Sequence, residues 1–325
     1  MNDNALSMTE ILDIYQRARR LYEEGSFSQA EREIIRYKSL VDYSQISHED
    51  RRTHGGCRLS VIIVSYNQGK ELITCLESLQ SPKDVSTEII LIDNGGNESI
   101  HAQLASRSLL HFQSPINFAP SEGRNIGAHF ATGEILVFVD DDCVVDPLFC
   151  DSIPLAFDTF DFLAIRGRVA AKSPGGNASA PRHYDLGNYP LPAPLLTEGN
   201  MAVPRDVYQT MGGMHPLMFG LEGMEFSWRL CKRFPDRDIY YWPGMLLRHD
   251  HVGWDGRGAK KKRHAIARRY LKTVMGGQAD LRAQYARWYD DRPGPFKRYE
   301  SRSVGTRLRH AVLDALAILL YGRRK

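Results

Sequence analysis

Three consecutive carboxylates follow an apolar run in the segment ILVFVDDD, residues 135–142. In an extended chain, Asp140 and Asp142 would point to one side and Asp141 to the other. Carboxylates just past the end of a strand suit Mg²⁺ or Mn²⁺, which keep water ligands and share a substrate phosphate. The cation would also remove the repulsion between the charges. The alternative interpretation is a strand end capped by solvated acids.

Other apolar runs also end on polar residues. Asp93 ends TEIILID ahead of a glycine turn, while Ser65, Tyr66 and Asn67 end the first run and lead into a helix. A turn-forming Asp-Asn-Gly and an ordinary helix cap by Asn67 are the alternative interpretations of these two segments.

The segment GRNIGAHF opens a helix just before the aspartate strand. Its residues Arg124 and Asn125 lie near the helix N-terminus. A basic side chain at such a place is well positioned for a pyrophosphate.

Short β-branched runs alternate with helical patterns between residues 59 and 140. The predicted strands are 59–66, 87–93, 109–115 and 134–140. The predicted helices are 70–80, 101–109 and 123–133. This alternation predicts a parallel sheet with right-handed crossovers. In such sheets ligands bind at the carboxyl ends of the strands, which is where the polar residues stand.

The remaining segments differ in character. Residues 8–43 have helical spacing with a break at Gly25-Ser26, which predicts a hairpin similar to a single tetratricopeptide unit. The hairpin either packs on the main domain or binds a partner. Residues 44–58 lack periodicity and are interpreted as a linker. The predicted domains are an N-terminal helical region, a central domain and a basic C-terminal helical region, at residues 1–55, 56–255 and 256–325.

Charge is distributed unevenly along the 325 residues. The formal net charge is +3, but residues 256–325 hold 19 Lys and Arg against 5 Asp and Glu, so the rest of the chain is acidic. This asymmetry predicts that the tail meets an anionic surface. Nucleic acid is disfavoured, since no aromatic-rich basic recognition motif is present. A cationic helix over RLRHAVLDALAILLYGRRK could lie on an anionic membrane, or pack on the central domain.

The compartment is constrained by cysteines and apolar runs. The 5 cysteines are scattered, which disfavours a zinc site or a disulfide framework and favours a reducing compartment. The polar N-terminus is not a signal peptide, and no apolar run reaches the ~18 residues of a membrane span. We expect a cytoplasmic protein. If the basic C-terminal region binds lipid, the protein would also lie peripherally on the inner face of a membrane.

The motifs SYN, DNGG, GRNIGAHFATGE, VDDD, EGNMAVPRDVYQTMGGM and GLEGMEFSWRL occur in that order. From about Leu59 to about His251, this set resembles the family-2 glycosyltransferases, which have the GT-A fold. The resemblance implies a Rossmann-like, mostly parallel sheet flanked by helices. It also implies a metal-dependent, inverting hexosyltransferase. Such an enzyme moves a sugar from a nucleotide-sugar to a hydroxyl of a glycan, of a lipid-linked acceptor or of a protein. The donor is expected to be a UDP-sugar because UDP-sugars are the most frequent donors.

The resemblance assigns binding roles to single residues. Tyr66 and Asp93 would contact the nucleotide base, and the Asp93 carboxylate would accept from a uracil N–H. The implied nucleotide-sugar-binding residues are Ser65, Tyr66, Asn67, Asp93, Arg124, Asn125, Asp140, Asp141, Gly199 and Asn200. The implied ligands of Mn²⁺ or Mg²⁺ are Asp140, Asp142 and His249. Asp142 is the expected direct ligand. His251 is the alternative to His249 as the histidine ligand.

One departure from the family pattern concerns the catalytic base. The family has an aspartate before its xELxWR helix, but Gly223 stands at that position. Glycine cannot take a proton, so Glu222 or Glu225 would serve as the base, or activity is lost. The longer side chain of Glu222 makes it the favoured candidate.

Three other functions compete for the same residues. A transferase-like adaptor that lost its base would explain Gly223. A sugar nucleotidylyltransferase would need a Gly-rich basic loop after the first strand, where SYNQGKEL has one glycine. A dinucleotide-dependent oxidoreductase would need G-x-G-x-x-G there, which is absent from the sequence. The oligomeric state is not indicated by the sequence.

Overall fold

The computed structural model describes residues 6–53, 56–67, 69–80, 84–95, 100–173, 182–250 and 257–274. The chain divides into two compact units. The helical unit contains Met1–Gln45, Pro216–Leu221 and Val252–Lys325. The sheet unit contains Ile46–His215 and Glu222–His251. Every candidate site residue belongs to the sheet unit.

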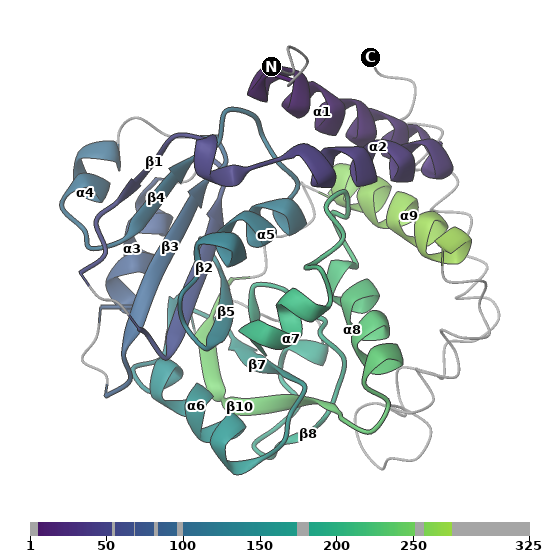
Figure 1. Ribbon diagram of the computed structural model, residues 1–325. Coiled ribbons are helices and arrows are strands. Elements are labelled where there is room, and N and C mark those ends of the chain that lie inside the picture. The colour runs from purple at the N-terminus through teal and green to yellow at the C-terminus, as the bar shows by residue number, and fades with distance from the viewer. Residues whose placement is uncertain are drawn as a thin grey trace. The chain divides into compact units, whose positions relative to one another are not determined.

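The sheet unit is built on one mixed sheet with the strand order β1-β4-β3-β2-β5-β9-β7-β10-β6, and β8 pairs with β10 (Figure 1). The strands are β1 His48–Asp50, β2 Leu59–Ser65, β3 Thr87–Asp93, β4 Leu110–Gln113, β5 Ile135–Asp140, β6 Val144–Val145, β7 Ala164–Ala170, β8 Leu191–Pro192, β9 Asn200–Pro204 and β10 Ile239–Arg248. Strands β4, β3, β2 and β5 run parallel, which confirms the prediction from the alternating pattern. β9 is antiparallel to β5 and β7, so the sheet is mixed.

Helices cover both faces of this sheet. They are α3 Lys70–Ser78, α4 His101–Ala105, α5 Pro120–Phe130, α6 Phe149–Thr159, α7 Arg205–Thr210 and α8 Glu222–Arg233. Leu59, Val61 and Ile63 of β2 share one apolar core with α3 and α6. Because side chains alternate along a strand, the residues between them face the opposite side.

That opposite side is covered by α5, which approaches the sheet closely. A Cβ at Gly127 would lie 2.3 Å from Ile62 Cγ2, and one at Gly123 would lie 2.7 Å from Val64 Cγ1. Glycine at these two places therefore permits the helix–sheet distance that brings the start of α5 to the strand ends.

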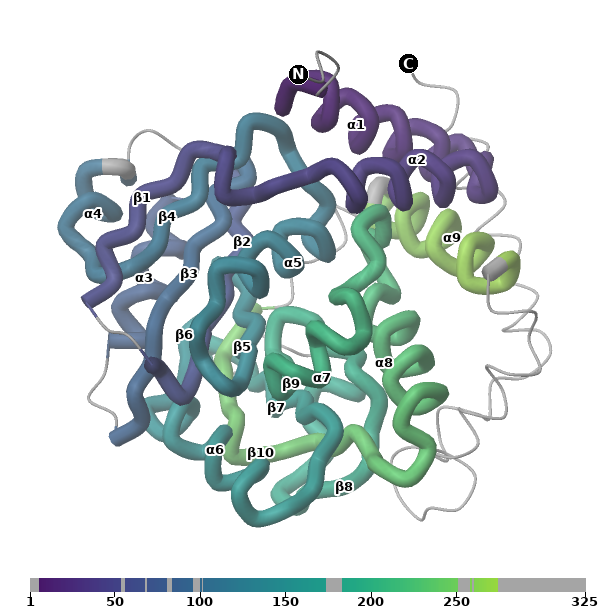
Figure 2. The backbone as a smooth tube through the Cα atoms, viewed as in Figure 1, coloured from purple at the N-terminus to yellow at the C-terminus, as the bar shows by residue number. Residues whose placement is uncertain are grey.

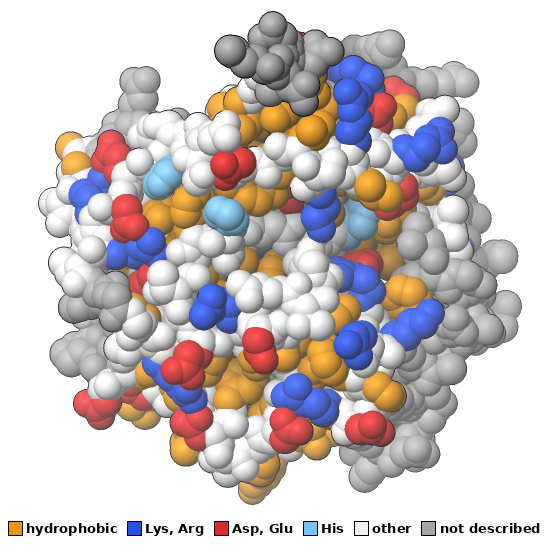
Figure 3. Space-filling view, in the orientation of Figure 1, with side chains coloured by type: hydrophobic (Ala, Val, Ile, Leu, Met, Phe, Trp, Pro, Cys, Tyr) orange, Lys and Arg blue, Asp and Glu red, His pale blue; other side chains and the backbone are white. Residues whose placement is uncertain are grey.

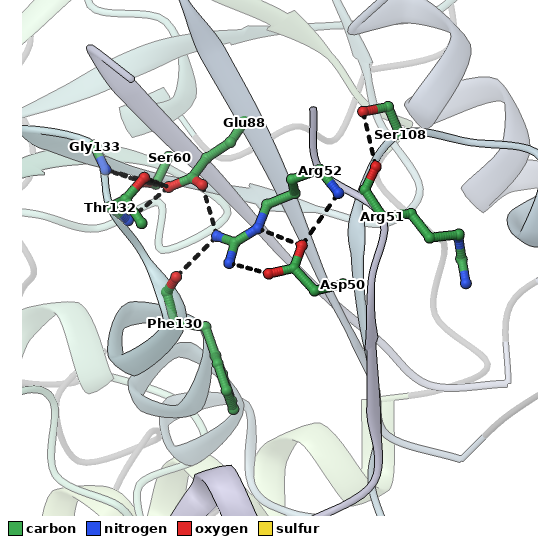
Figure 4. Close-up of polar contacts among 9 residues, drawn as sticks. All are labelled: Asp50, Arg51, Arg52, Ser60, Glu88, Ser108, Phe130, Thr132 and Gly133. Carbon is green, nitrogen blue, oxygen red and sulfur yellow. Dashed lines mark hydrogen bonds and ion pairs between the residues drawn. The ribbon is translucent and has the colours of Figure 1, made fainter. Parts of the chain in front are cut away.

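The predicted linker is wrong in one part, because residues His48–Asp50 form β1 and pair antiparallel with β4. This edge strand is secured by charge rather than by an apolar pattern (Figure 4). Arg52 Nη2 lies 2.6 Å from Asp50 Oδ2, and its Nη1 lies 2.6 Å from Glu88 Oε2. The buried Glu88 carboxylate also accepts from Ser60 Oγ at 2.5 Å and from the backbone N–H of Thr132 at 2.6 Å. Periodicity in the sequence does not reveal such a network.

The helical unit contains α1 Met8–Glu24, α2 Phe27–Leu40 and α9 Arg257–Val274, with a short 3₁₀ turn at Tyr43–Gln45. The predicted hairpin is confirmed: α1 and α2 lie side by side (Figure 2). Gly25 ends α1 at φ 87°, a left-handed conformation that suits glycine. The rings of Tyr22 and Phe27 pack against Tyr270 of α9, with centroids 5.3 and 5.5 Å away.

Within the described residues, no helix has both the length and the apolar character that a membrane span requires. The predicted cationic helix near the C-terminus and the alternative ligand His251 lie outside the described residues.

Candidate active site

The carboxyl ends of β2, β3 and β5 lie next to one another at one edge of the sheet. The register pairs Ser65 with Asp93 and Val64 with Asp140. The predicted polar segments 65–67 and 93–95 therefore meet the aspartates of β5 in space. This follows from the parallel pairing, because parallel strands end at the same edge.

The loops after β2 and β3 are bonded to each other. The Asn94 N–H donates to Ser65 O at 2.8 Å, and the Asn67 N–H donates to Gly95 O at 3.1 Å. Asn67 has φ 54°, a left-handed conformation that asparagine tolerates. A Cβ at Gly95 would lie 2.8 Å from the ring of Tyr66, which is 59% exposed. The pair of loops thus presents a flat, accessible ring beside Asp93.

Asp93 itself is buried, with 8% of its surface exposed. Its carboxylate accepts from His111 Nε2 of β4 at 3.3 Å and from the Gly95 N–H at 3.4 Å. His111 is not among the residues predicted from sequence, because its place on β4 beside Asp93 is set by strand pairing.

The three aspartates have three different environments. β5 ends at Asp140 and the chain turns at the next two residues, so the expected alternation of side chains does not extend past Asp140. Asp141 accepts from the Tyr66 N–H at 3.3 Å. Burial is the main cause that raises the pKa of Asp141 to about 7. The hydrogen bond from Ser65 lowers this pKa, and the negative charges of Asp142 and Asp140 raise it further.

Asp142 is joined to His249, which follows β10. The distance between Asp142 Oδ2 and His249 Nε2 is 3.1 Å. Burial would raise the pKa of Asp142, but the hydrogen bond and charge of His249 outweigh burial and lower it. Burial would lower the pKa of His249, and Asp142 raises it overall. The carboxylate and the imidazole therefore support each other's charged form.

Arg124 connects three elements at the same edge. The buried Arg124 guanidinium, in the second turn of α5, lies 3.4 Å from Asp140 Oδ1 through Nη2, and 3.3 Å from Glu222 Oε1 of α8 through Nη1. Gly199 completes the contact: a Cβ there would lie 1.8 Å from Asp140 Cγ. The predicted neighbours Arg124, Asp140 and Gly199 are thus in one place.

Glu198 also lies in this cluster and is not among the residues predicted from sequence. Its Oε1 accepts from the Gly223 N–H at 2.8 Å, at the first turn of α8. Burial, and after it the charge of Glu222, raise the pKa of Glu198 to about 7, while Arg124 acts in the opposite direction. The signal that could have found it is a carboxylate just ahead of Gly199-Asn200 in the sequence.

Other predicted residues have structural partners. Glu225 is bonded to Arg229 Nε at 2.5 Å on the same helix. The Asn125 amide accepts from Tyr208 OH at 2.7 Å and donates to Met214 O at 2.9 Å. These contacts indicate that Glu225 and Asn125 hold neighbouring segments of the sheet unit together.

Asn200 does not present its side chain at the surface. It is 1% exposed, and its Nδ2 donates to Arg168 O at 2.9 Å and to Met245 O at 3.3 Å. The expected contact of the Asn200 side chain with a sugar is therefore not supported. The residue instead fixes the start of β9 against the adjacent strand β7 and against β10, the strand beyond it.

No group of three or more His, Cys, Asp or Glu side chains in the described part of the chain forms a metal site by itself. Asp142 offers a carboxylate oxygen, the kind of ligand that Mg²⁺ and Mn²⁺ prefer. His249 would add a nitrogen ligand once its imidazole is neutral, because a metal ligand must be deprotonated. Two protein ligands fit a cation that shares the phosphates of its substrate. The residues present therefore fit a divalent cation bound together with a diphosphate.

The family model described as Glycosyl transferase family 2 matches residues 60–208. This range extends from β2 to α7 and includes Asp93, Arg124 and the three aspartates. This part of the chain belongs to glycosyl transferase family 2, whose members transfer a sugar from a nucleotide-sugar donor.

Several curated proteins are similar to this chain. An uncharacterized glycosyltransferase of Haemophilus influenzae is 22% identical over 241 residues, which cover 70% of this chain and 82% of that protein. AglE, a glycosyltransferase of Haloferax volcanii, is 25% identical over 60% of this chain and 66% of its own length. The uncharacterized glycosyltransferase YibD of Escherichia coli is 35% identical, but over only 30% of this chain and 29% of its own.

Solved structures share the fold at low sequence identity. TarS 1-349 of S. aureus in complex with UDP-GlcNAc has a TM-score of 0.53 and 15% identity, over 72% of this chain and 71% of that one. GalNAc-T7 with UDP, GalNAc and Mn²⁺ has a TM-score of 0.50 and 17% identity, over 78% and 55%. These likenesses confirm the predicted GT-A fold.

Proposed function

We propose that this glycosyltransferase is a metal-dependent, inverting hexosyltransferase that uses a UDP-sugar. The observation that carries the proposal is the meeting of three features at one sheet edge. These are the Tyr66–Asp93 loops, the Asp142–His249 pair and the Arg124 guanidinium beside Asp140. The loops would contact the nucleotide base, the Asp142–His249 pair would hold the metal-bound diphosphate, and Arg124 would stabilise the negative charge that develops on it.

The donor end of the site is supported by the loops after β2 and β3. The exposed Tyr66 ring offers a stacking surface for the base. The Asp93 carboxylate would accept from a uracil N–H, as the family resemblance implies, while His111 holds the carboxylate in place. A buried, pre-positioned acceptor favours a base that carries a donor.

The diphosphate end is supported by Asp142, His249 and Arg124. Asp142 and His249 would hold Mn²⁺ or Mg²⁺, with Asp140 beside them. When bound, the cation supplies Lewis-acid stabilisation of the leaving diphosphate. The Arg124 cation, already placed next to Asp140, stabilises negative charge at the same end.

The acceptor end is supported by the carboxylates at the start of α8. Glu222 and Glu198 both lie in the cluster around Arg124. A carboxylate from this cluster would take the proton of the attacking hydroxyl. Attack opposite the leaving group in one displacement inverts the anomeric configuration.

The acceptor is proposed to be a hydroxyl of a glycan, a lipid-linked glycan or a protein.

The basic C-terminal region is proposed to contact an anionic membrane from the cytoplasmic side. α9 holds 8 Lys and Arg and no Asp or Glu. On the face drawn in Figure 3, by contrast, described basic and acidic side chains are interspersed. Flotation with vesicles of phosphatidylcholine and phosphatidylserine is expected to show binding that salt weakens. Equal flotation with neutral vesicles would contradict an electrostatic contact.

The central experiment is a thermal-shift panel of UDP-, GDP- and dTDP-sugars with and without Mn²⁺, followed by measurement of nucleotide release. Ligand binding to the native state raises Tm. UDP-sugars with Mn²⁺ are expected to give the largest increase and to release UDP. A protein that binds them without any release would instead act as an adaptor, the function that Gly223 by itself favours.

A further inference from the structure

Gly223 stands where the family resemblance places the catalytic aspartate, and the structure gives a physical reason for the glycine. A Cβ at residue 223 would lie 2.1 Å from the backbone oxygen of Leu195 and 2.7 Å from Glu198 Oε1. The first contact involves backbone, which cannot simply rotate away. No side chain, and so no carboxylate, fits at this position of α8.

The space is filled from the segment before β9. Glu198 Oε1 accepts from the Gly223 N–H at 2.8 Å, so its carboxylate lies against the helix start. The segment is anchored again one turn later, since Ser227 Oγ accepts from the Leu195 N–H at 2.9 Å and donates to Gly223 O at 2.6 Å. The glycine and the glutamate thus form one arrangement, in which the carboxylate comes from residue 198.

The other acids near α8 are bound in different ways. Glu222 is paired with the buried Arg124, and Glu225 is held by Arg229 Nε at 2.5 Å and Nη2 at 2.9 Å. Glu198 accepts from a backbone N–H and is half-buried. Its neighbour Gly199 lies against the Asp140 carboxylate, so Glu198 is adjacent to the aspartate cluster.

We propose that Glu198 is the general base of the transfer reaction, in place of the aspartate that residue 223 cannot carry. This assignment rests on the proposed function. The Glu198 carboxylate accepts the proton of the acceptor hydroxyl while that oxygen forms a bond to the anomeric carbon. The bond from the anomeric carbon to the donor phosphate oxygen breaks, and the nucleoside diphosphate leaves with its electron pair. Glu222 holds Arg124 and acts as a positioning residue.

The protonation of Glu198 is suited to this role. Its pKa, raised to about 7 by burial and by Glu222, lies near neutral pH, where a general base is most effective. Activity is therefore expected to rise with pH through this value, because the base must be deprotonated.

The test compares Glu198→Gln, Glu198→Ala, Glu222→Gln and the control Glu134→Gln in the full-length chain. Glutamine keeps the acceptor for the Gly223 N–H, so the fold is expected to persist. Glu134 is 65% exposed and stands at the opposite end of β5 from Asp140. UDP release is measured from UDP-glucose, UDP-galactose and UDP-GlcNAc with Mn²⁺, in water and with simple sugars as acceptors, and UDP affinity is measured separately.

Glu198→Gln is expected to lower kcat by about 10²–10⁴-fold with UDP affinity unchanged, and to remove the rise of activity near pH 7. Added formate is expected to restore part of the activity of Glu198→Ala, which a structural role would not permit. Glu134→Gln should match the wild type. Two results would overturn the assignment and leave the proposed function standing. One is turnover by Glu198→Gln within a few-fold of wild type. The other is a larger loss in Glu222→Gln together with an unchanged pH profile in Glu198→Gln. Wild-type protein that neither binds UDP with Mn²⁺ nor releases it overturns both.

Discussion

His249 Nε2 lies 3.1 Å from Asp142 Oδ2, although 107 positions separate the two residues in the sequence. The contact joins the turn after β5 to the residue that follows β10. Neither side chain alone would indicate a metal site, but the pair stands at the strand ends where we propose that a divalent cation binds.

Asp142→Asn and His249→Ala are each expected to weaken metal-dependent turnover strongly. Loss of even a hydrogen-bonded partner of a metal ligand typically costs about 10–100-fold in metal affinity or activity. EDTA should abolish turnover by the wild type, and Mn²⁺ should restore it. The measurement is UDP release as a function of Mn²⁺ concentration, with UDP-sugar held constant. Unchanged Mn²⁺ dependence in both variants would remove the metal from this pair.

Tyr66→Ala is expected to weaken donor binding about tenfold, because stacking of a base on an aromatic ring is worth about 1–3 kcal/mol. Tyr66→Phe keeps the ring and should bind UDP as the wild type does. The ring is largely exposed, so neither change should alter Tm by much. Isothermal titration with UDP distinguishes the two variants. Equal affinity in Tyr66→Ala would place the base elsewhere.

Gly199→Ala is expected to displace the Asp140 carboxylate, since the new Cβ would lie 1.8 Å from Asp140 Cγ. UDP release should fall. The effect should largely vanish when Asp140 is also changed to alanine, because the clash is then relieved. A double-mutant cycle on UDP affinity and Tm measures this coupling. Additive losses in the double variant would show that the alanine disturbs something other than Asp140.

Glu88→Gln is expected to destabilise the sheet unit by about 3 kcal/mol, because it leaves the charge of Arg52 without its buried partner. The burial of Glu88 would raise its pKa, but the bonds from Ser60 and Thr132 and the charge of Arg52 lower the pKa below 4.5. A carboxyl whose pKa is lowered on folding contributes stability above its unfolded value and loses it as pH falls through the folded value.

The difference between wild type and Glu88→Gln should therefore be full near pH 7 and should shrink below about pH 4. Urea unfolding at a series of pH values measures it. Glu134→Gln, which changes an exposed carboxylate, is the matched control and should stay within about 0.5 kcal/mol of wild type. A stability difference that grows as the pH falls would contradict the lowered pKa of Glu88.

Much of the sheet could be predicted because its signals are local. The apolar runs ending at Ser65, Asp93 and Asp140 are strands buried on both faces, and parallel strands must end at one edge. The hairpin break at Gly25 is equally local, since a left-handed helix end favours glycine. Candidate site residues on these ends were found because the chemistry and the strand end coincide in the sequence.

Other features depend on contacts between distant segments. β1 is held by Arg52 and Glu88 rather than by a pattern, so its sequence resembles a linker. The turn after Asp140 interrupts the alternation that would place Asp142 beside it. These outcomes depend on tertiary contacts that a local window of sequence does not contain.

The sequence by itself determined the family, the order of the elements and the residues at the strand ends, because periodicity and short motifs encode them directly. The tertiary structure decided which carboxylate stands at α8. Gly223 and Glu198 are 25 residues apart, and only the packing of the segment before β9 against α8 brings the Gly223 N–H and Glu198 Oε1 within 2.8 Å. Side-chain partners across such separations are set by three-dimensional packing, not by spacing along the chain.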